Sequence, residues 1–320
     1  MHMIVAEGDI LEHIANTRPS HWRRGPSRQA CVTYSHALSK TAWAQRHQQR
    51  VVLAEGHEVL ASAERFDFTA MLDQSRVRVC GIGTIVADPK HENEGHERAL
   101  LDRLVEAAGR DGSDVALIVV AHQESSAPAG FEKIPTTDVE IKVAESAGRG
   151  APMTPVRSGE DRDLSAIVAM GETRARPYRF HLDRDVDLVK HAITRRRLGA
   201  GLSIGGDRQL WFMIAEEGIT AAAYLVITVA DRTWTIEECG DRDPSGARVG
   251  ALLQALIARE PAEARPVIRA WLPPGFVPPQ VTVVSATPAE EVMMMRVLRP
   301  AIPQPRLSSN DVLYWRGDIF

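Results

Sequence analysis

The segment between Val77 and Val120 constrains the fold more than any other part of the sequence. It opens with an apolar stretch broken by two glycines, which is typical of a bulged strand. From about Glu97 the pattern turns helical, with one apolar face formed by Leu100, Leu101, Leu104, Val105 and Ala108. The continuous apolar run Val115–Val120 then resembles a buried parallel strand. The segment therefore predicts a strand, a loop, a helix and a second strand.

The two halves of the chain repeat one order of elements: helices, a hairpin, a strand, a loop, a helix and a strand. In the first half, the elements expected before the segment above are helices at 7–22 and Ser35–Gln48 and strands at Val51–Ala54 and Val59–Phe68. In the second half we expect helical structure over 163–200, strands at Leu210–Ala215, Ala221–Val229 and Thr233–Glu238, a helix at Ala251–Arg259 and a strand at Pro266–Leu272. The repeat predicts two domains of one kind.

The length of 320 residues also suits two domains better than one core. The best boundary is Ser146–Pro155, which is rich in Gly, Ala and Pro and has no periodicity. Ser158 and Asp161 resemble a capping box that starts the helix after it. We therefore expect one domain at 1–147 and another at 156–320.

Composition and charge exclude several classes of function. The net charge is -4, so no basic field is expected to recruit nucleic acid. No apolar run approaches the roughly 18 residues that cross a bilayer, and no signal peptide is expected at the acidic N-terminus. The three cysteines, Cys31, Cys80 and Cys239, are too widely spaced for a disulfide framework or a metal pair. We expect a cytoplasmic protein without membrane or nucleic-acid partners.

The stretch Ile85–Leu101, with the sequence IVADPKHENEGHERALL, carries the clearest chemical signal. It joins the end of a predicted strand to the start of a predicted helix. The unpaired N–H groups and the positive dipole end of a helix N-terminus favour a bound phosphate. Gly95 permits close approach of a ligand to the backbone.

This loop resembles the pyrophosphate loop of the GNAT superfamily of N-acetyltransferases, whose pattern is Gln/Arg-x-x-Gly-x-Gly/Ala. Glu92, Gly95 and Glu97 stand at its three defining positions without a gap. The resemblance implies that the backbone of Ile85, Val86 and Ala87 pairs with the pantetheine arm of acetyl-CoA or another acyl-CoA. It also implies that backbone N–H groups of the following loop hold the pyrophosphate, in a run formed by Asn93, Glu94, Gly95, His96, Glu97 and Arg98.

The resemblance extends over nearly the whole chain beyond residue 50. The second half resembles bacterial tandem GNAT proteins at Ile236–Leu253, Ala270–Gln280 and Val312–Phe320. The two-domain arrangement is distantly similar to the enhanced intracellular survival acetyltransferases. It implies an α/β (α+β) chain of two tandem GNAT domains, each a mixed, mostly antiparallel sheet flanked by helices. The loop at Asp241–Gly250 lacks the pyrophosphate pattern, so we expect the second domain to be degenerate.

Two residues are candidates for catalysis by this resemblance. The family commonly has a Tyr that acts as general acid shortly after its fifth strand. The stretch His122–Phe131 contains no Tyr, and Ser126 stands near the expected position. Ser126 is either a proton relay through water or an ordinary loop residue. In the survival-type acetyltransferases the terminal carboxylate reaches the active site. The Phe320 carboxylate is therefore a candidate general base, the alternative being a terminus that only packs.

No metal is expected. The histidines in His91-Glu92 and His96-Glu97 are five residues apart, whereas a helical zinc pair needs four. The leading hypothesis is an acyl-CoA-dependent N-acyltransferase that acts on a small-molecule amine by direct transfer. The alternative is an inactive GNAT-fold protein that binds CoA, a metabolite or a protein partner, because Glu92, Glu94 and Glu97 place three carboxylates in the loop. A homo-oligomer is compatible with the sequence.

Overall fold

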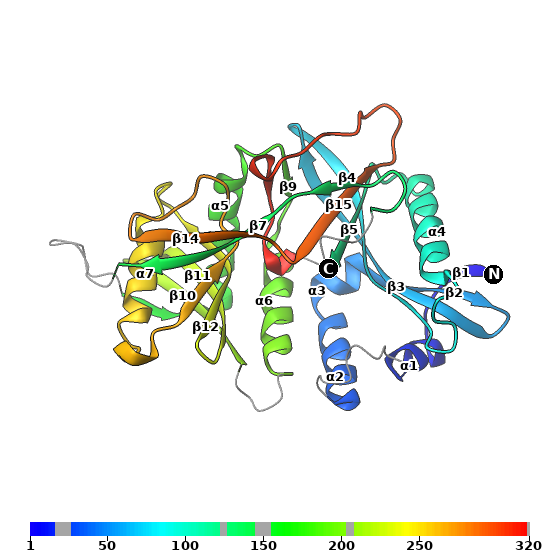
Figure 1. Cartoon of the computed structure of the whole chain (residues 1–320), viewed down its shortest axis with the longest axis horizontal. Coiled ribbons are helices and arrows are strands. Elements are labelled where there is room, and N and C mark those ends of the chain that lie inside the picture. Colours follow the sequence, from blue (N-terminus) through cyan, green and yellow to red (C-terminus); the bar gives the residue numbers. More distant parts are fainter. Residues whose placement is uncertain (17–26, 122–126, 145–154, 203–207, 319–320) are drawn as a thin grey trace. The chain divides into compact units, whose positions relative to one another are not determined.

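The computed structural model describes residues 1–16, 27–121, 127–144, 155–202 and 208–318. These residues form two compact units, each built on its own sheet (Figure 1). The first unit comprises Met1–Pro135 together with Glu290–Ser308. The second comprises Thr136–Ala289 together with the described residues from Ser309 to Asp318. Each unit is described separately below.

The sheet of the first unit runs in the order β1-β2-β3-β4-β5-β15-β6. β4 and β5 are parallel, and the other neighbours in this order are antiparallel. The strands are β1 (His2–Val5), β2 (Gln48–Glu55), β3 (Glu58–Leu72), β4 (Ser75–Ala87), β5 (Val115–Ala121), β6 (Glu132–Ile134) and β15 (Glu291–Val297). The parallel pair confirms the interpretation of Val115–Val120 as a buried parallel strand.

Helix α4 (His96–Arg110) connects β4 to β5 and packs on β3 and β4. Its predicted apolar face is confirmed, because all five residues of that face are buried and belong to the core that the helix shares with the sheet. Leu100 and Leu104 are completely buried. Burying one such side chain contributes about 1.5–3 kcal/mol, so this face fixes the helix over the sheet.

The helical structure before β2 differs from the sequence prediction. The helix expected over Ser35–Gln48 is two helices, α2 (Arg28–Ser39) and α3 (Ala42–His47), and α1 (Asp9–Asn16) precedes them. Thr41 separates the two, because its Oγ1 accepts the N–H of Ala44 and so caps a new helix. Trp43 is buried as expected and stacks on Phe66, with ring centroids 6.1 Å apart.

The sheet of the second unit runs in the order β14-β7-β13-β12-β11-β10-β8. Here β12 and β13 are the parallel pair. The strands are β7 (Thr137–Val143), β8 (Val156–Ser158), β10 (Arg208–Glu217), β11 (Thr220–Ala230), β12 (Thr233–Asp241), β13 (Val267–Ala270) and β14 (Val281–Pro288). Helix α7 (Ala247–Ile257) connects β12 to β13 as α4 connects β4 to β5, so the predicted repeat of hairpin, strand, loop, helix and parallel strand is confirmed.

The sequence predicted helical structure over 163–200, but the structure has two separate helices there. The helical structure is broken between α5 (Leu164–Ala175) and α6 (Val186–Ala200), and the short strand β9 (Phe180–Leu182), which pairs with β16 (Val312–Leu313), lies in the break. Pro177 cannot donate a helical hydrogen bond, and Asp185 caps α6 by accepting the N–H of Leu188 at 2.7 Å.

The capping box before α5 also differs from the prediction. The residues that form it are Glu160 and Asp163, around a short 3₁₀ turn at Asp161–Asp163. Ser158, the predicted cap, instead ends β8, where it pairs with Met213.

The division into units differs from the contiguous domains 1–147 and 156–320. β7 belongs to the second sheet, between β13 and β14, and β15 belongs to the first sheet, between β5 and β6. Most of the expected boundary segment lies outside the described residues. None of the described helices combines the length and apolar character needed to cross a membrane.

Candidate functional site

The first unit contains a bulge near the end of β4. Glu64 on β3 pairs with Gly83, but Ser62 pairs with Val86, so two residues of β4 face a single residue of β3. Thr84, in the bulge, has a φ of 48°, which is unusual for a β-branched residue. The bulge lies in the strand where the sequence predicted one from its glycines.

Beyond this bulge the sheet opens. In the described residues, pairing between β4 and β5 runs from Val79 opposite Val115 to Ile82 opposite Ile118 and then stops. The N–H of Asp88 donates to Leu60 on β3, so the N–H of its neighbour Ala87 faces the opposite side. The N–H of Ala87 thus points away from β3, and it donates to Oε1 of Glu97.

The loop that follows β4 leads into the N-terminus of α4. Asn93 and Gly95 adopt left-handed backbone conformations, with φ of 69° and 80°, and Gly95 precedes the first helical residue. In the described part of the chain, no group accepts the N–H donors of His96, Glu97 and Arg98. These three donors and the helix dipole form a positive, unfilled end that suits an anion.

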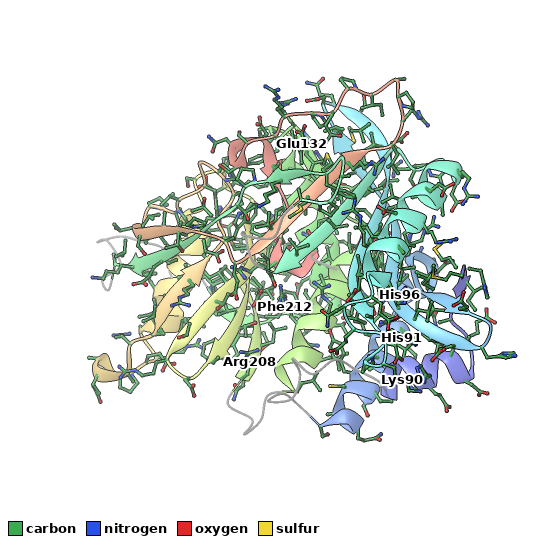
Figure 2. The ribbon with its side chains drawn as sticks, turned by 45° about the vertical axis from the view of Figure 1, so that its right-hand side comes forward. Lys90, His91, His96, Glu132, Arg208 and Phe212 are labelled. Carbon is green, nitrogen blue, oxygen red and sulfur yellow. The ribbon has the colours of Figure 1, made fainter. Side chains whose placement is uncertain are left out.

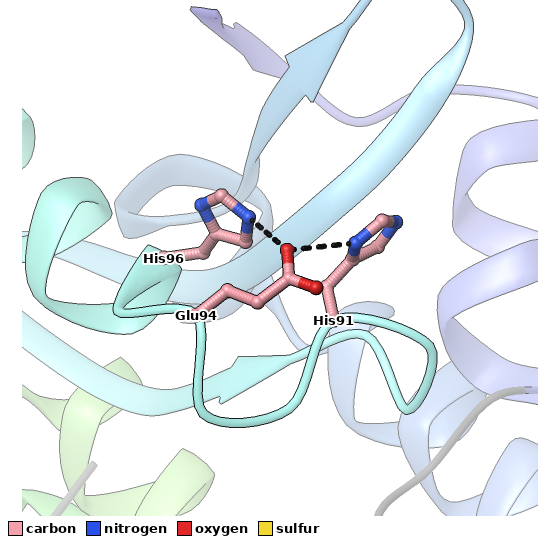
Figure 3. A group of neighbouring side chains, drawn as sticks. All are labelled: His91, Glu94 and His96. Atoms are coloured by element: carbon pink, nitrogen blue, oxygen red, sulfur yellow. Dashed lines mark hydrogen bonds and ion pairs between the residues drawn. The ribbon is translucent and has the colours of Figure 1, made fainter.

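The three loop carboxylates have different positions. Glu92 is exposed to solvent. Glu94 Oε2 lies between two imidazoles, 3.1 Å from His91 Nδ1 and 3.0 Å from His96 Nε2 (Figure 3). Glu97 Oε1 accepts the N–H of Ala87 at 3.2 Å, so this carboxylate uses a backbone donor that the GNAT resemblance assigns to pantetheine.

His91, Glu94 and His96 form a compact cluster at the start of α4 (Figure 3). Figure 2 shows the two histidines near each other on the first unit. The other ring nitrogen of His91, Nε2, lies 3.0 Å from Oε1 of Glu58 on β3. The carboxylates of Glu58 and Glu94 raise the pKa of His91, and the imidazoles of His91 and His96 lower the pKa of Glu94. Sequence reasoning considered the two histidines but missed Glu94, although the spacing His-x-x-Glu-x-His brings all three together in a turn.

A cavity of about 480 Å³ borders the beginning of this loop, between α1 and the turn that joins β2 to β3. Asp88 and Lys90 line it together with His13 of α1. His13 Nε2 lies 2.8 Å from Oδ2 of Asp88, whose side chain is almost completely buried. This contact ties α1 to the end of β4 and so fixes where the loop begins.

The corresponding loop of the second unit is closed by its own side chains. Gly246, with a φ of 74°, precedes α7 as Gly95 precedes α4. Oδ2 of Asp241 accepts the N–H groups of Arg248 and Val249, at 2.8 and 3.2 Å. A carboxylate of the protein therefore already occupies the anion position at α7, in contrast to the open end of α4.

The two predicted catalytic residues, Ser126 and Phe320, lie outside the described residues. The chain just before the terminus is anchored in the second unit by Asp318. Its Oδ1 lies 3.1 Å from Nε of Arg184, and its Oδ2 accepts the N–H of Trp315. Burial raises the pKa of Asp318 to about 6. Arg184 also contacts Glu238, which accepts the hydroxyl of Tyr224 at 2.6 Å, and sequence reasoning missed this buried network.

Neither a protein-family model nor the sequence of a curated protein matches the chain. Solved structures match it over nearly its full length. A GCN5-related N-acetyltransferase (GNAT) from Anabaena variabilis has a TM-score of 0.66 at 12% identity, covering 93% of this chain and 73% of the other. Eis1 from Mycobacterium abscessus has a TM-score of 0.55 at 14% identity, covering 93% and 73%.

The N-myristoyltransferase of Saccharomyces cerevisiae, in a structure with bound myristoyl-CoA, also matches. Its TM-score is 0.52 at 9% identity, and the match covers 92% of this chain and 77% of the other. The structural similarity establishes the architecture. Because the sequence identities are low, the reaction has to be argued from the residues of this chain. The chain therefore has the fold of the GCN5-related N-acetyltransferases.

Proposed function

We propose that the first unit binds an acyl-CoA, most simply acetyl-CoA, and transfers the acyl group to a small-molecule amine. The observation that carries the proposal is the opening between β4 and β5, which leads to the unfilled N-terminus of α4. The end of β4 can pair with an amide chain, and the N-terminus of α4 can hold a diphosphate. The two follow one another in the chain. Acyl-CoA has these two chemical parts in the same order.

The residues of this path have defined roles in the proposal. The backbone of Ile85, Val86 and Ala87 would pair with pantetheine, and the N–H groups from Asn93 to Arg98 would hold the pyrophosphate. Glu97 would have to release the N–H of Ala87 before pantetheine could use it. The similar solved structures include N-acetyltransferases and an N-myristoyltransferase, which supports acyl transfer as the reaction class.

The proposed reaction is a direct transfer. The neutral amine attacks the thioester carbonyl, the new N–C bond forms, and the C–S bond breaks to release the thiolate of CoA. A base accepts the proton that the amine loses, and an acid returns a proton to the thiolate. We assign the base to the Phe320 carboxylate and a proton relay to Ser126.

The assignment of Phe320 predicts opposite results for two changes at the terminus. Deleting Phe320 is expected to lower turnover of an accepted amine by about a hundredfold or more, because a positioned base contributes that much. Phe320→Ala keeps the terminal carboxylate at the same position in the chain and is expected to retain most of the turnover. Steady-state kinetics of both variants, with circular dichroism as a check of folding, makes the comparison. Unchanged turnover after the deletion would remove the base from this position.

A second candidate function is binding without reaction. It is favoured by the contact between Glu97 and Ala87, which leaves the pantetheine position partly filled, and by the absence of Tyr from the sequence of His122–Phe131. In this case the first unit would bind CoA, a metabolite or a protein partner and would show no turnover with any amine.

Calorimetric titration of the purified chain with acetyl-CoA tests the proposed site. Gly95→Trp is expected to weaken binding by about tenfold or more, because a Cβ at Gly95 meets no protein atom within 4 Å and an indole there projects into the space a ligand would fill. Gly218→Trp is a matched control, since Gly218 also has a positive φ and an open Cβ direction but lies in a hairpin turn of the second unit. Binding that is absent, or equally affected by both changes, would contradict the site.

A further inference from the structure

The side chains of His91, Glu94 and His96 have no role in the proposed acyl transfer, which uses only the backbone N–H groups of Glu94 and His96. One atom of each side chain can serve as a ligand, and these three atoms lie within 4.8 Å of one another. Oε2 of Glu94 is the centre of the group, at 3.1 Å from His91 Nδ1 and 3.0 Å from His96 Nε2 (Figure 3). Two imidazoles and one carboxylate are the ligand types that zinc accepts.

We propose that His91 Nδ1, Glu94 Oε2 and His96 Nε2 bind a divalent transition metal of the zinc class. Zinc bonds of about 2.0–2.2 Å in a tetrahedron separate neighbouring ligand atoms by about 3.3 Å. The separations of Glu94 Oε2 from the two imidazole nitrogens, 3.1 and 3.0 Å, are slightly shorter than this. The two imidazole nitrogens lie within 4.8 Å of each other, so the ion requires the side chains to rotate until all three separations match. Three protein ligands leave a fourth position for water or for an oxygen of an anionic ligand.

A second observation supports the site from a different element of the fold. Nε2 of His91, the ring nitrogen that would not bind the metal, lies 3.0 Å from Oε1 of Glu58 on β3. The contact has the distance of an ion pair without the alignment of a hydrogen bond. Rotation of the ring on metal binding would let Nε2–H donate to this carboxylate, an arrangement that fixes the tautomer of a metal-binding histidine and increases its basicity. The rings of His91 and His96 are also largely shielded, with 18% and 15% of their side-chain surface exposed.

The local charges favour a cation in spite of the helix dipole. The N-terminus of α4 is positive and by itself repels a metal ion. Four carboxylates, however, belong to the cluster, contact it or adjoin it in sequence: Glu58, Glu92, Glu94 and Glu97. The basic side chains beside it in sequence are Lys90 and Arg98, and Arg98 is already paired with Asp102. A bound dication would offset these charges, which otherwise oppose an anion at this helix end. A metal ion bound here would explain why the loop carries several carboxylates even though the helix N-terminus beside it suits a phosphate.

Calorimetric titration of the chelator-treated full chain with Zn²⁺ tests the proposal. We expect a single site of micromolar or tighter affinity that Co²⁺ also fills, with the visible absorption of tetrahedral Co²⁺. Glu58→Gln is expected to weaken Zn²⁺ binding by about tenfold, and His96→Gln or Glu94→Gln by more. His57→Gln, an exposed histidine in the nearby turn, is the matched control and is expected to bind as the unaltered chain does.

Two results would overturn the site. One is the absence of Zn²⁺ binding to the unaltered, folded chain. The other is binding whose affinity is the same in His96→Gln and in the unaltered chain, which would place the ion on other histidines. Because no acyl-CoA is present in the titration, failure here is distinct from failure of acyl-CoA binding.

Discussion

At the scale of single residues, the position of one carboxylate distinguishes the N-terminus of α4 from that of α7. Asp241 fills the end of α7 by accepting two of its N–H groups, so no external anion is needed there. Glu97 reaches back to Ala87 on β4 and leaves the first N–H groups of α4 unused. Both positions were visible in the sequence as acids near a loop. Their opposite effects follow from side-chain direction, which local spacing does not determine.

His191 gives a residue-scale prediction about pH. It is buried on α6, and burial, with a smaller effect from Arg195, lowers its pKa to about 3. The unfolded chain takes up this proton at about pH 6.5, so the stabilisation is complete above that pH and is lost as the pH falls toward 3.

As the pH falls from about 7 to about 5, protonation of His191 in the unfolded chain is expected to lower the free energy of unfolding by about 2 kcal/mol. His191→Leu, which cannot titrate, should lack this part of the loss. Urea unfolding followed by tryptophan fluorescence checks it, since Trp211, Trp234, Trp271 and Trp315 report on the second unit. His36→Leu, at an exposed position, serves as control. A pH dependence of the His191 variant equal to that of the unaltered chain would contradict the assignment.

At the scale of elements, the sequence predicted what is set by local pattern. The apolar face of α4, the parallel strand β5 and the second hairpin all depend on periodicity over a few residues, and the structure has them. The breaks were missed at Thr41 and at Pro177, where a cap or a proline ends a helix inside an otherwise helical composition. The grouping of Glu94 with His91 and His96 was missed because these residues come together in a turn instead of along a helix face.

β15 gives an element-scale prediction. It lies between β5 and β6 in the first sheet, and Met294 at its centre is completely buried. A fragment of residues 1–147 lacks this strand and exposes the edge of β5, so we expect it to show no cooperative unfolding transition.

A matched fragment can restore the strand. β6 and β15 are antiparallel with Ile134 opposite Met293, so a short turn can join residue 135 to residue 290. Residues 1–135 linked in this way to 290–308 are expected to unfold cooperatively. Thermal unfolding by circular dichroism compares the two fragments. Equal cooperativity would show that β15 is dispensable for the first unit.

At the scale of the whole molecule, the described residues form two units of one kind, which differ at the helix that follows the loop. Asp241 accepts N–H groups at the start of α7, whereas no described group accepts the first N–H groups of α4. The repeat was predictable because both halves carry the same order of patterns. The exchange of β7 and β15 between the units was not, since strand pairing between residues far apart in sequence leaves no local signal. We therefore expect the residues at the ends of the two loops, and not the shared fold, to determine what each unit binds.

The acetyl-CoA affinity of Glu97→Ala tests the central claim most directly. The substitution frees the N–H of Ala87, removes a charge and places alanine where the GNAT pattern has glycine or alanine. We expect binding to tighten by about tenfold, the equivalent of one hydrogen bond to a charged group. Glu92→Ala removes an equal charge from an exposed position without freeing a donor, and is expected to change affinity less. Equal effects of the two substitutions, or no acetyl-CoA binding by either variant, would contradict an acyl-CoA site at the end of β4.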